Sequence, residues 1–179
     1  MAAPLEERFR TIRELHPEYR VETVQGRIVV NEAGTWQHNT SLFRVMRALF
    51  APTVERGWQI WPNITIHLGL QSDRYVPDLT VVPRSPRLHK EYAVHGDSTL
   101  LIVDVVSSGS AYDDYYVKPR GYSPAGVPLY LVVDPAQRTV RLHSEPGGLA
   151  YGRETIASVA EPLFLPAPWE LPLNVAAFW

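Results

Sequence analysis

Two aspartates and a lysine stand where the sequence predicts two strands and the helix after them. Asp78 follows Pro77 at the start of a β-branched run, Asp104 interrupts the apolar run 100–106, and Lys118 comes shortly afterwards. Two carboxylates and a cation on adjacent elements are what a protein needs to hold a divalent metal ion beside a phosphodiester. The spacing therefore predicts phosphodiester hydrolysis as the chemistry of this chain.

The expected cofactor is Mg²⁺ or Mn²⁺. Mg²⁺ prefers oxygen ligands in octahedral geometry and often keeps several waters beside one or two carboxylates. We expect Asp78 and Asp104 to bind it if their strands are neighbours, with the backbone carbonyl of Val105 or Val106 as a further ligand. Lys118 is expected to orient the attacking water or to stabilise charge in the transition state, as a compact point charge.

Each of these residues also has a simpler interpretation. A carboxylate inside an apolar run loses hydration unless it is paired or bound to a metal. Asp104 could instead end its strand and accept backbone hydrogen bonds from Ser107 or Ser108. Asp114 is a secondary candidate, but it lies four residues before Lys118, and an ordinary helical ion pair explains it equally well. The combination of acids and lysine on these elements favours the metal site over each separate interpretation.

Glu22 and His38 are further candidates. Glu22 lies on a predicted hairpin, where it is either an additional metal ligand or a solvated strand residue. His38, near the start of a predicted helix, is either a contact to phosphate or metal or a structural histidine. The side chains of His89, Lys90 and His95 lack the spacing of metal ligands, so we expect them to lie on a mobile loop.

Composition restricts the function classes. The chain has 179 residues, a net charge of −2 and no cysteine, which excludes disulfides, thiolate catalysis and cysteine metal sites. A secretory signal and an apolar membrane span are not visible, so a cytoplasmic location is expected. Proteins that bind duplex DNA along many phosphates usually carry a basic excess. A DNA-binding role would therefore need local basic clusters or a symmetric partner.

The predicted elements form a single mixed α/β (or α+β) domain, 1–179, around one central sheet. Helices are expected at 4–16, at 36–50 with Thr35 as N-cap and Pro52 at its end, and at 112–122. Strands are expected at 19–24, 27–31, 58–68, 75–82, 100–106, 129–133, 140–143 and 154–159. Residues 83–97 are expected to be an irregular loop, and 146–179 a proline-rich extension.

These residues resemble the PD-(D/E)XK nuclease superfamily and, more closely, the Uma-type restriction endonucleases of bacteria. The matching segments are Glu22 to Gly26, His38, Val76-Pro77-Asp78, Asp104-Val105-Val106-Ser107, Asp114 to Lys118 to Tyr122, and Gly126 to Asp134. The resemblance implies a restriction-endonuclease-like core over about 19–143, with a central mixed β-sheet flanked by helices.

The resemblance also assigns roles. It implies that Asp78 and Asp104 bind metal, and that Lys118 on the following helix replaces a lysine at the position of Val106. Asp104 stands where the family usually has glutamate, Pro119 directly follows the lysine, and Leu131 replaces a tryptophan.

The expected function is metal-dependent cleavage of DNA by an endonuclease, and two cuts in a duplex suit a homodimer. Two alternatives stay open. One is a catalytically weak or inactive nuclease-fold protein with a binding or regulatory role, and the other is a hydrolase acting on RNA or nucleotides. The sequence carries no motif for reading bases, so it predicts no cleavage specificity.

Overall fold

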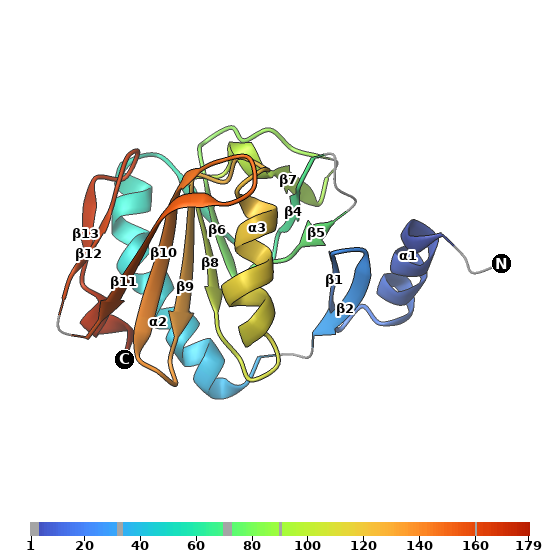
Figure 1. Ribbon diagram of the computed structural model, residues 1–179, viewed down its shortest axis with the longest axis horizontal. Helices are drawn as coiled ribbons and strands as arrows, with labels where there is room; N and C mark the ends of the chain where they lie inside the picture. Colours follow the sequence, from blue (N-terminus) through green and yellow to red (C-terminus); the bar gives the residue numbers. More distant parts are fainter. Residues whose placement is uncertain (1–3, 32–33, 70–72, 90, 160) are drawn as a thin grey trace.

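A computed structural model describes residues 4–31, 34–69, 73–89, 91–159 and 161–179. Its strands form a six-stranded sheet, a five-stranded sheet and a two-stranded ribbon, with helices packed beside them (Figure 1). The predicted mixed α/β class is confirmed. The predicted central mixed β-sheet is confirmed as the six-stranded sheet, but two strands that were predicted to be continuous are divided between it and a second, five-stranded sheet.

The six-stranded sheet contains the strand of Asp104 at its centre. Its order is β11 (Tyr151–Ser158), β10 (Thr139–Pro146), β9 (Leu129–Asp134), β8 (Leu101–Val105), β6 (Leu79–Val82) and β3 (Gln59–Pro62). Strands β8 and β9 are parallel, and the other neighbours are antiparallel. Strands β8 and β9 are buried on both faces, which explains why they are nearly continuous apolar runs in the sequence.

Helices cover the two faces of this sheet (Figure 1). The long helix α2 (Trp36–Glu55) packs Val45 and Leu49 into a core with Leu101, Val103 and Val105. Side chains alternate along a strand, so residues 102 and 104 point to the opposite face. That face carries a helical segment made of η2 (Asp113–Val117), which has π-helical geometry, and α3 (Lys118–Tyr122).

Helix α2 is longer than predicted. We expected it to end near Phe50 because Pro52 cannot donate a backbone hydrogen bond, but it continues to Glu55. A proline removes one hydrogen bond and strains one turn. Here Thr53 is buried immediately after it, so packing of the last turn against the protein retains the helix. The predicted N-cap is confirmed, since the Thr35 hydroxyl accepts from the backbone N–H of His38 at 3.3 Å.

The five-stranded sheet contains the N-terminal hairpin. Its order is β2 (Arg27–Asn31), β1 (Arg20–Val24), β5 (Arg74–Tyr75), β4 (Thr65–His67) and β7 (Ala93–His95). Helix α1 (Leu5–Leu15) lies beside the hairpin at one end of the molecule (Figure 1). Val24, Ile66 and Tyr75 share a second core with Ile102 and Tyr130 of the larger sheet. The five-stranded sheet therefore faces the side of β8 that carries Asp104.

Two predicted strands are each divided by a backbone turn. The predicted strand 58–68 separates into β3 and β4 at Asn63, which has a positive φ of 52°. The predicted strand 75–82 separates into β5 and β6 around Pro77, which has no N–H to donate to a neighbouring strand. In both cases the chain leaves one sheet and enters the other, and this brings the two sheets together around the candidate site.

The expectation of an irregular loop at 83–97 is also wrong. Strand β7 and the 3₁₀ turn η1 (Gly96–Ser98) lie in this segment, and Leu88 forms an isolated antiparallel bridge with Val94. Lys90, which was expected on that loop, lies outside the described residues. The segment is ordered by pairing with β4, a contact between residues distant in the sequence that local composition does not reveal.

The proline-rich C-terminus contributes to the main core. Strands β12 (Leu163–Leu165) and β13 (Leu171–Leu173) form the ribbon, and η3 (Val175–Phe178) ends the chain. Trp169 is fully buried and donates from Nε1 to the carbonyl of Leu100 at 3.1 Å. Organisation as a single domain, 1–179, stays a prediction. Among the described residues, none of the helices is long and apolar enough for a membrane crossing.

Candidate active site

Asp78 lies directly before β6 and accepts contacts from three separate elements. Arg20 at the start of β1 donates from Nη1 to Oδ1 at 2.7 Å. His38 in the first turn of α2 places Nε2 3.1 Å from Oδ2, and the backbone N–H of Val105 donates to Oδ2 at 2.7 Å. Burial alone would raise the pKa of Asp78, but the His38 hydrogen bond and the Arg20 charge outweigh it and lower this pKa to about 2.

Sheet register brings the two predicted acids together. Strands β6 and β8 are antiparallel neighbours, with Leu79 opposite Val103. Extending this register by one residue sets Asp78 opposite Asp104. The predicted adjacency of their strands is therefore confirmed, and the hydrogen bond from Val105 to Asp78 joins the ends of the two strands.

Asp104 is fully buried and has two contacts through one oxygen. Its Oδ2 accepts a hydrogen bond from the Tyr130 hydroxyl at 3.0 Å and lies 3.1 Å from Lys118 Nζ. Its Oδ1 has no hydrogen-bond partner among the described residues. The alternative of Ser107 or Ser108 capping this carboxylate is not what the structure shows, because the Ser107 N–H donates to Ser110 Oγ instead.

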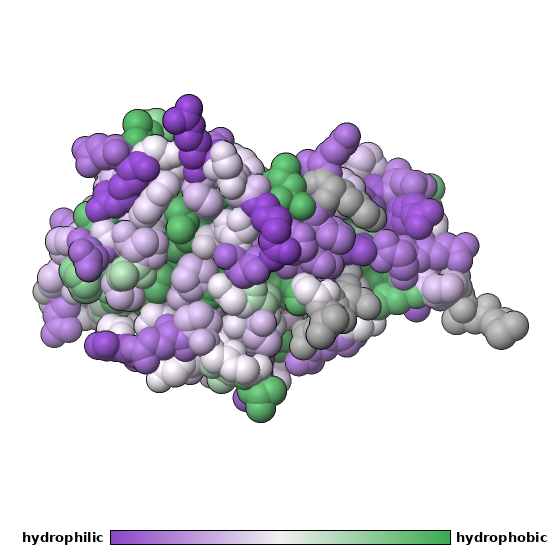
Figure 2. Space-filling view, turned by 90° about the horizontal axis from the view of Figure 1, so that it is seen from above, coloured by the Kyte–Doolittle hydropathy of each residue, from purple (hydrophilic) through white to green (hydrophobic). Residues whose placement is uncertain are grey.

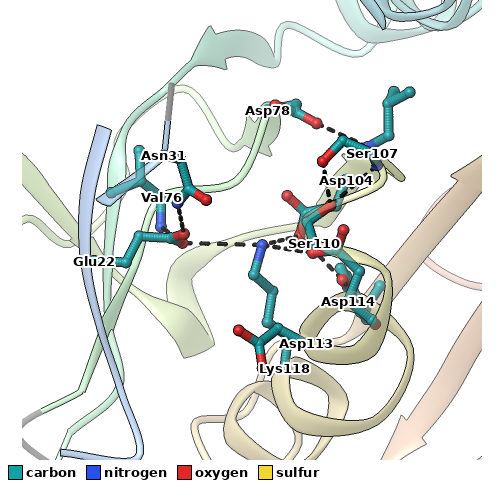
Figure 3. A network of polar contacts seen from close by, with 12 residues as sticks. Glu22, Asn31, Val76, Asp78, Asp104, Ser107, Ser110, Asp113, Asp114 and Lys118 are labelled. Carbon is teal, nitrogen blue, oxygen red and sulfur yellow. Dashed lines mark hydrogen bonds and ion pairs between the residues drawn. The ribbon is translucent and has the colours of Figure 1, made fainter. Parts of the chain in front are cut away.

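Lys118 points into the protein from the start of α3 and lies among three carboxylates (Figure 3). Its Nζ is 2.8 Å from Asp114 Oδ1, 3.1 Å from Asp104 Oδ2 and 3.9 Å from Glu22 Oε1. The predicted helical pair with Asp114 is present, but both partners are buried, unlike an exposed helical pair. Burial would lower the pKa of Lys118, whereas the surrounding carboxylates raise it well above its usual value.

Glu22 is held in a fixed orientation by the hairpin. Its Oε2 accepts from Asn31 Nδ2 at 2.7 Å, and its Oε1 accepts from the backbone N–H of Val76 at 2.6 Å. The residue is only 2% exposed. Its interpretation as a solvated strand residue is therefore wrong, and Glu22 belongs to the same buried network as Lys118 (Figure 3).

These side chains form what we call the acidic cluster. Its members are Glu22, Asp78, Asp104, Asp114, Arg20 and Lys118. The carboxylates outnumber the permanent cations by two, and charge buried without compensation is costly. Burial raises the pKa of Asp104 to about 7, although Lys118 opposes this shift. The hydrogen bond to Asp78 raises the pKa of His38, which supplies part of the missing positive charge.

The acidic cluster has oxygen atoms available to bind a divalent cation. The unpartnered Oδ1 of Asp104 is one available oxygen. The two oxygens of an ionised carboxylate offer about four acceptor positions. Three contacts occupy three of these positions on Asp78, so about one is left for a cation. No group of three His, Asp or Glu side chains in the described part of the chain forms a ready-made metal site. Two carboxylates with water are a ligand set that Mg²⁺ accepts, so the donor set fits.

A cleft of about 1090 Å³ leads from the surface to Asp78. Arg20 and His38 line it together with polar residues, among them Asn31, Asn63, Ser107 and Ser108. Asp104 and Lys118 lie deeper and are not part of its wall. Seen from above, the end of the molecule that carries α1 is mostly hydrophilic (Figure 2). A polar ligand could therefore approach the acidic cluster from the side of Asp78.

Sequence reasoning missed Arg20 and Tyr130. Arg20 lies two residues before Glu22 on β1, and this spacing places both on one face of a strand. That alternation was a usable signal. Tyr130 was harder to find, because it contacts Asp104 through the parallel pairing of β8 and β9 and not through any spacing in the sequence. Of the predicted residues, Val105 touches Asp78 through its N–H, and its carbonyl as a ligand stays a prediction.

Comparison with known proteins agrees with this architecture. The Uma2 family, described as "Putative restriction endonuclease", matches residues 6–176. A crystal structure titled as a putative nuclease belonging to DUF820 from Anabaena variabilis ATCC 29413 superposes with a TM-score of 0.70. The two chains are 14% identical, and the match covers 88% of each, which shows a shared fold. No curated protein matches the chain. The match over nearly the whole length confirms the resemblance found in the motifs: this chain belongs to the Uma2 family of putative restriction endonucleases.

Proposed function

We propose that this protein is a metal-dependent endonuclease that hydrolyses DNA phosphodiester bonds with Mg²⁺ or Mn²⁺. The observation that carries the proposal is the acidic cluster, in which Asp78 and Asp104 meet on neighbouring strands beside Lys118. The excess of buried carboxylates supports a divalent cation, and the cleft provides a route to Asp78. Membership of the Uma2 family supports a nucleic-acid substrate.

In this proposal the chain fixes the ligands before the substrate arrives. Arg20, His38 and the Val105 N–H hold the Asp78 carboxylate in one orientation. When bound, the cation would lower the pKa of a coordinated water and neutralise charge on the phosphoryl oxygens. Lys118 holds Asp104 and supplies a fixed positive charge at that end of the site.

The displaced lysine is compatible with this role. Lys118 reaches the carboxylate of Asp104 from the helix, although residue 106 on the strand is valine. The turn before it is π-helical, and the Lys118 N–H bonds back to the carbonyl of Asp113. Single π turns occur frequently at functional sites. Pro119 follows without interrupting the helical segment, so the proline does not prevent Lys118 from pointing at the acids.

The test is cleavage of plasmid DNA, single-stranded DNA and RNA by the purified chain with Mg²⁺, with Mn²⁺ and with EDTA. We expect metal-dependent cleavage of DNA. The cleavage rate should fall about 10²-fold or more in Asp78→Asn and in Asp104→Asn, because removal of one electrostatic contact in an active site has an effect of this size. Asp97→Asn, which changes an exposed acid paired with Arg87, is the matched control and should retain activity. Cleavage that persists in EDTA, or in Asp78→Asn, would contradict the proposal. Cleavage of RNA alone would favour the alternative of a hydrolase that acts on RNA.

A catalytically inactive binding protein is the competing function. The observation that favours it is the burial of Asp104 beside Lys118, whose Nζ already lies 3.1 Å from the carboxylate where a metal ion would bind. Calorimetric titration of Mg²⁺ and Mn²⁺ into the wild-type chain separates the two functions. The nuclease proposal requires binding that Asp78→Ala weakens, whereas an absence of binding for both ions would favour the inactive protein.

We also propose a homodimer and a cytoplasmic location. Two cuts in a duplex suit a two-fold symmetric enzyme. Helix α2 exposes Trp36, Phe43 and Phe50 at seven-residue steps along one side, an apolar surface that supports self-association. Sedimentation of the wild-type chain and of Phe43→Ser tests the assembly, with a shift to monomer expected in the variant.

A further inference from the structure

Three histidines gather at the edge of the five-stranded sheet, away from the residues of the acidic cluster. His67 ends β4 and His95 ends β7, and the parallel register of these strands sets the two residues directly opposite each other. The rings of His67 and His89 stack with centroids 3.7 Å apart, and the rings of His67 and His95 meet edge to face at 5.0 Å. The ring centroids of His89 and His95 are 5.4 Å apart.

We propose that His67, His89 and His95 form a binding site for one divalent transition-metal ion, with Zn²⁺ as the representative ligand. Imidazole is a preferred ligand of such ions, and three protein ligands with one water complete a tetrahedral site. His67 lies on β4, His95 on β7 and His89 on the segment that precedes β7. One bound ion would therefore link β4, β7 and this preceding segment.

The distances between the rings are close to what coordination needs. Three imidazoles bound tetrahedrally with Zn–N bonds of about 2.1 Å have ring centroids roughly 5 Å apart. The two pairs that include His95 already meet this spacing, at 5.0 and 5.4 Å. Only the stacked pair has to open, from 3.7 Å. Because the described residues hold no ready-made group of three ligands, metal binding requires a side-chain rotation that separates the stacked rings of His67 and His89.

The backbone that carries the rings is already fixed. The N–H of His89 donates to the carbonyl of Ala93 at 2.7 Å, and the N–H of His95 donates to the carbonyl of Arg87 at 3.1 Å. In this proposal the backbone keeps these hydrogen bonds, and the nitrogen atoms come together by rotation about side-chain bonds. A site whose backbone is ordered in advance loses less conformational entropy on binding.

The rings are free to act as ligands. Within the described residues, none of the three makes a side-chain hydrogen bond or ion pair, and the Nδ1 atom of His67 is buried without a partner. Burial, the neighbouring imidazoles and nearby arginines lower the pKa of His67. Neutral imidazole has the lone pair that a metal requires. The arginines themselves are paired, Arg74 with Glu6 at 2.8 Å and Arg87 with Asp97 at 2.6 Å.

The site is independent of the proposed nuclease function, and the test keeps the two apart. Zn²⁺ is titrated by calorimetry into the Asp78→Asn chain, in which the candidate nuclease ligand is removed. We expect one equivalent to bind, and His89→Ala or His95→Ala in the same background to weaken binding at least tenfold. His16→Ala, which changes a histidine at the end of α1, is the matched control and should bind as before.

Thermal unfolding supplies a second readout. Zn²⁺ should raise the melting temperature of the Asp78→Asn chain more than that of its His89→Ala derivative, while unfolding in chelator shows that both chains are folded. The proposal is overturned if Zn²⁺ does not bind the Asp78→Asn chain. It is also overturned if both histidine variants bind as tightly as their parent.

Discussion

Replacing Asp104 by asparagine should stabilise the metal-free protein. Asparagine keeps the shape of the side chain and can still accept from the Tyr130 hydroxyl, but it removes a charge from a fully buried position. Burial raises the pKa of Asp104 to about 7, with Lys118 opposing. An unfolded aspartate has a pKa of about 3.9, and about three units at 1.36 kcal/mol each amount to on the order of 4 kcal/mol.

The stability difference between Asp104→Asn and the wild-type chain should depend on pH. Because the Asp104 pKa is higher in the folded than in the unfolded protein, its contribution to stability is fully present below about pH 4. That contribution is lost as the pH rises toward 7. Asparagine does not titrate, so the advantage of Asp104→Asn should be near zero at pH 4, grow up to pH 7 and stay constant above it. The free energy of unfolding from urea denaturation in EDTA, measured at several pH values, provides the test.

Two comparisons decide whether the reasoning holds. Asp97→Asn removes an exposed charge and should change the unfolding free energy by no more than about 0.5 kcal/mol. Mg²⁺ should then stabilise the wild-type chain more than Asp104→Asn, because a bound cation favours the ionised carboxylate. A variant that is less stable than wild type at pH 7 to 8, or a difference that does not change with pH, would refute the inference that Lys118 compensates the buried charge of Asp104 only in part.

Two other substitutions test the packing around the acidic cluster. Lys118→Met should destabilise the protein by about 3 to 5 kcal/mol, because it leaves Asp104 and Asp114 buried without their cation; the urea midpoint checks this, and a loss below about 1 kcal/mol would contradict it. Gly121→Ala places a Cβ 2.5 Å from the Tyr75 hydroxyl and should cost about 1 to 3 kcal/mol. Gly148→Ala, where a Cβ meets nothing within 4 Å, is its control in thermal unfolding, and equal melting temperatures would show that Tyr75 moves aside freely.

Much of the local structure could be predicted from the sequence. The N-terminal helix, the hairpin, the buried strand β8 and the helical segment before Tyr122 lie close to their predicted positions. These elements follow from hydrophobic periodicity and from turn residues, which act over a few neighbouring positions. The boundaries failed where packing with distant residues prevailed, as in α2, which continues past Pro52, and in the segment 83–97, which pairs with β4.

The sequence by itself determined which groups are available. It places a carboxylate inside the apolar run of β8, and it places Asp114 four residues before Lys118, so that one helical turn brings the two together. Burial of Asp104 follows from its apolar neighbours, because only a strand covered on both faces accommodates such a run.

Only the tertiary structure decided what those groups contact. The register of β6 against β8 sets Asp78 opposite Asp104, and the folding of the second sheet over that face brings Arg20 and Glu22 to the same place. Pairing of β4 with β7 likewise brings His67 to His95. The physical reason is that electrostatic interactions depend on distance in space and on burial. Both quantities are set by contacts between strands far apart in the chain, which no local pattern of residues encodes.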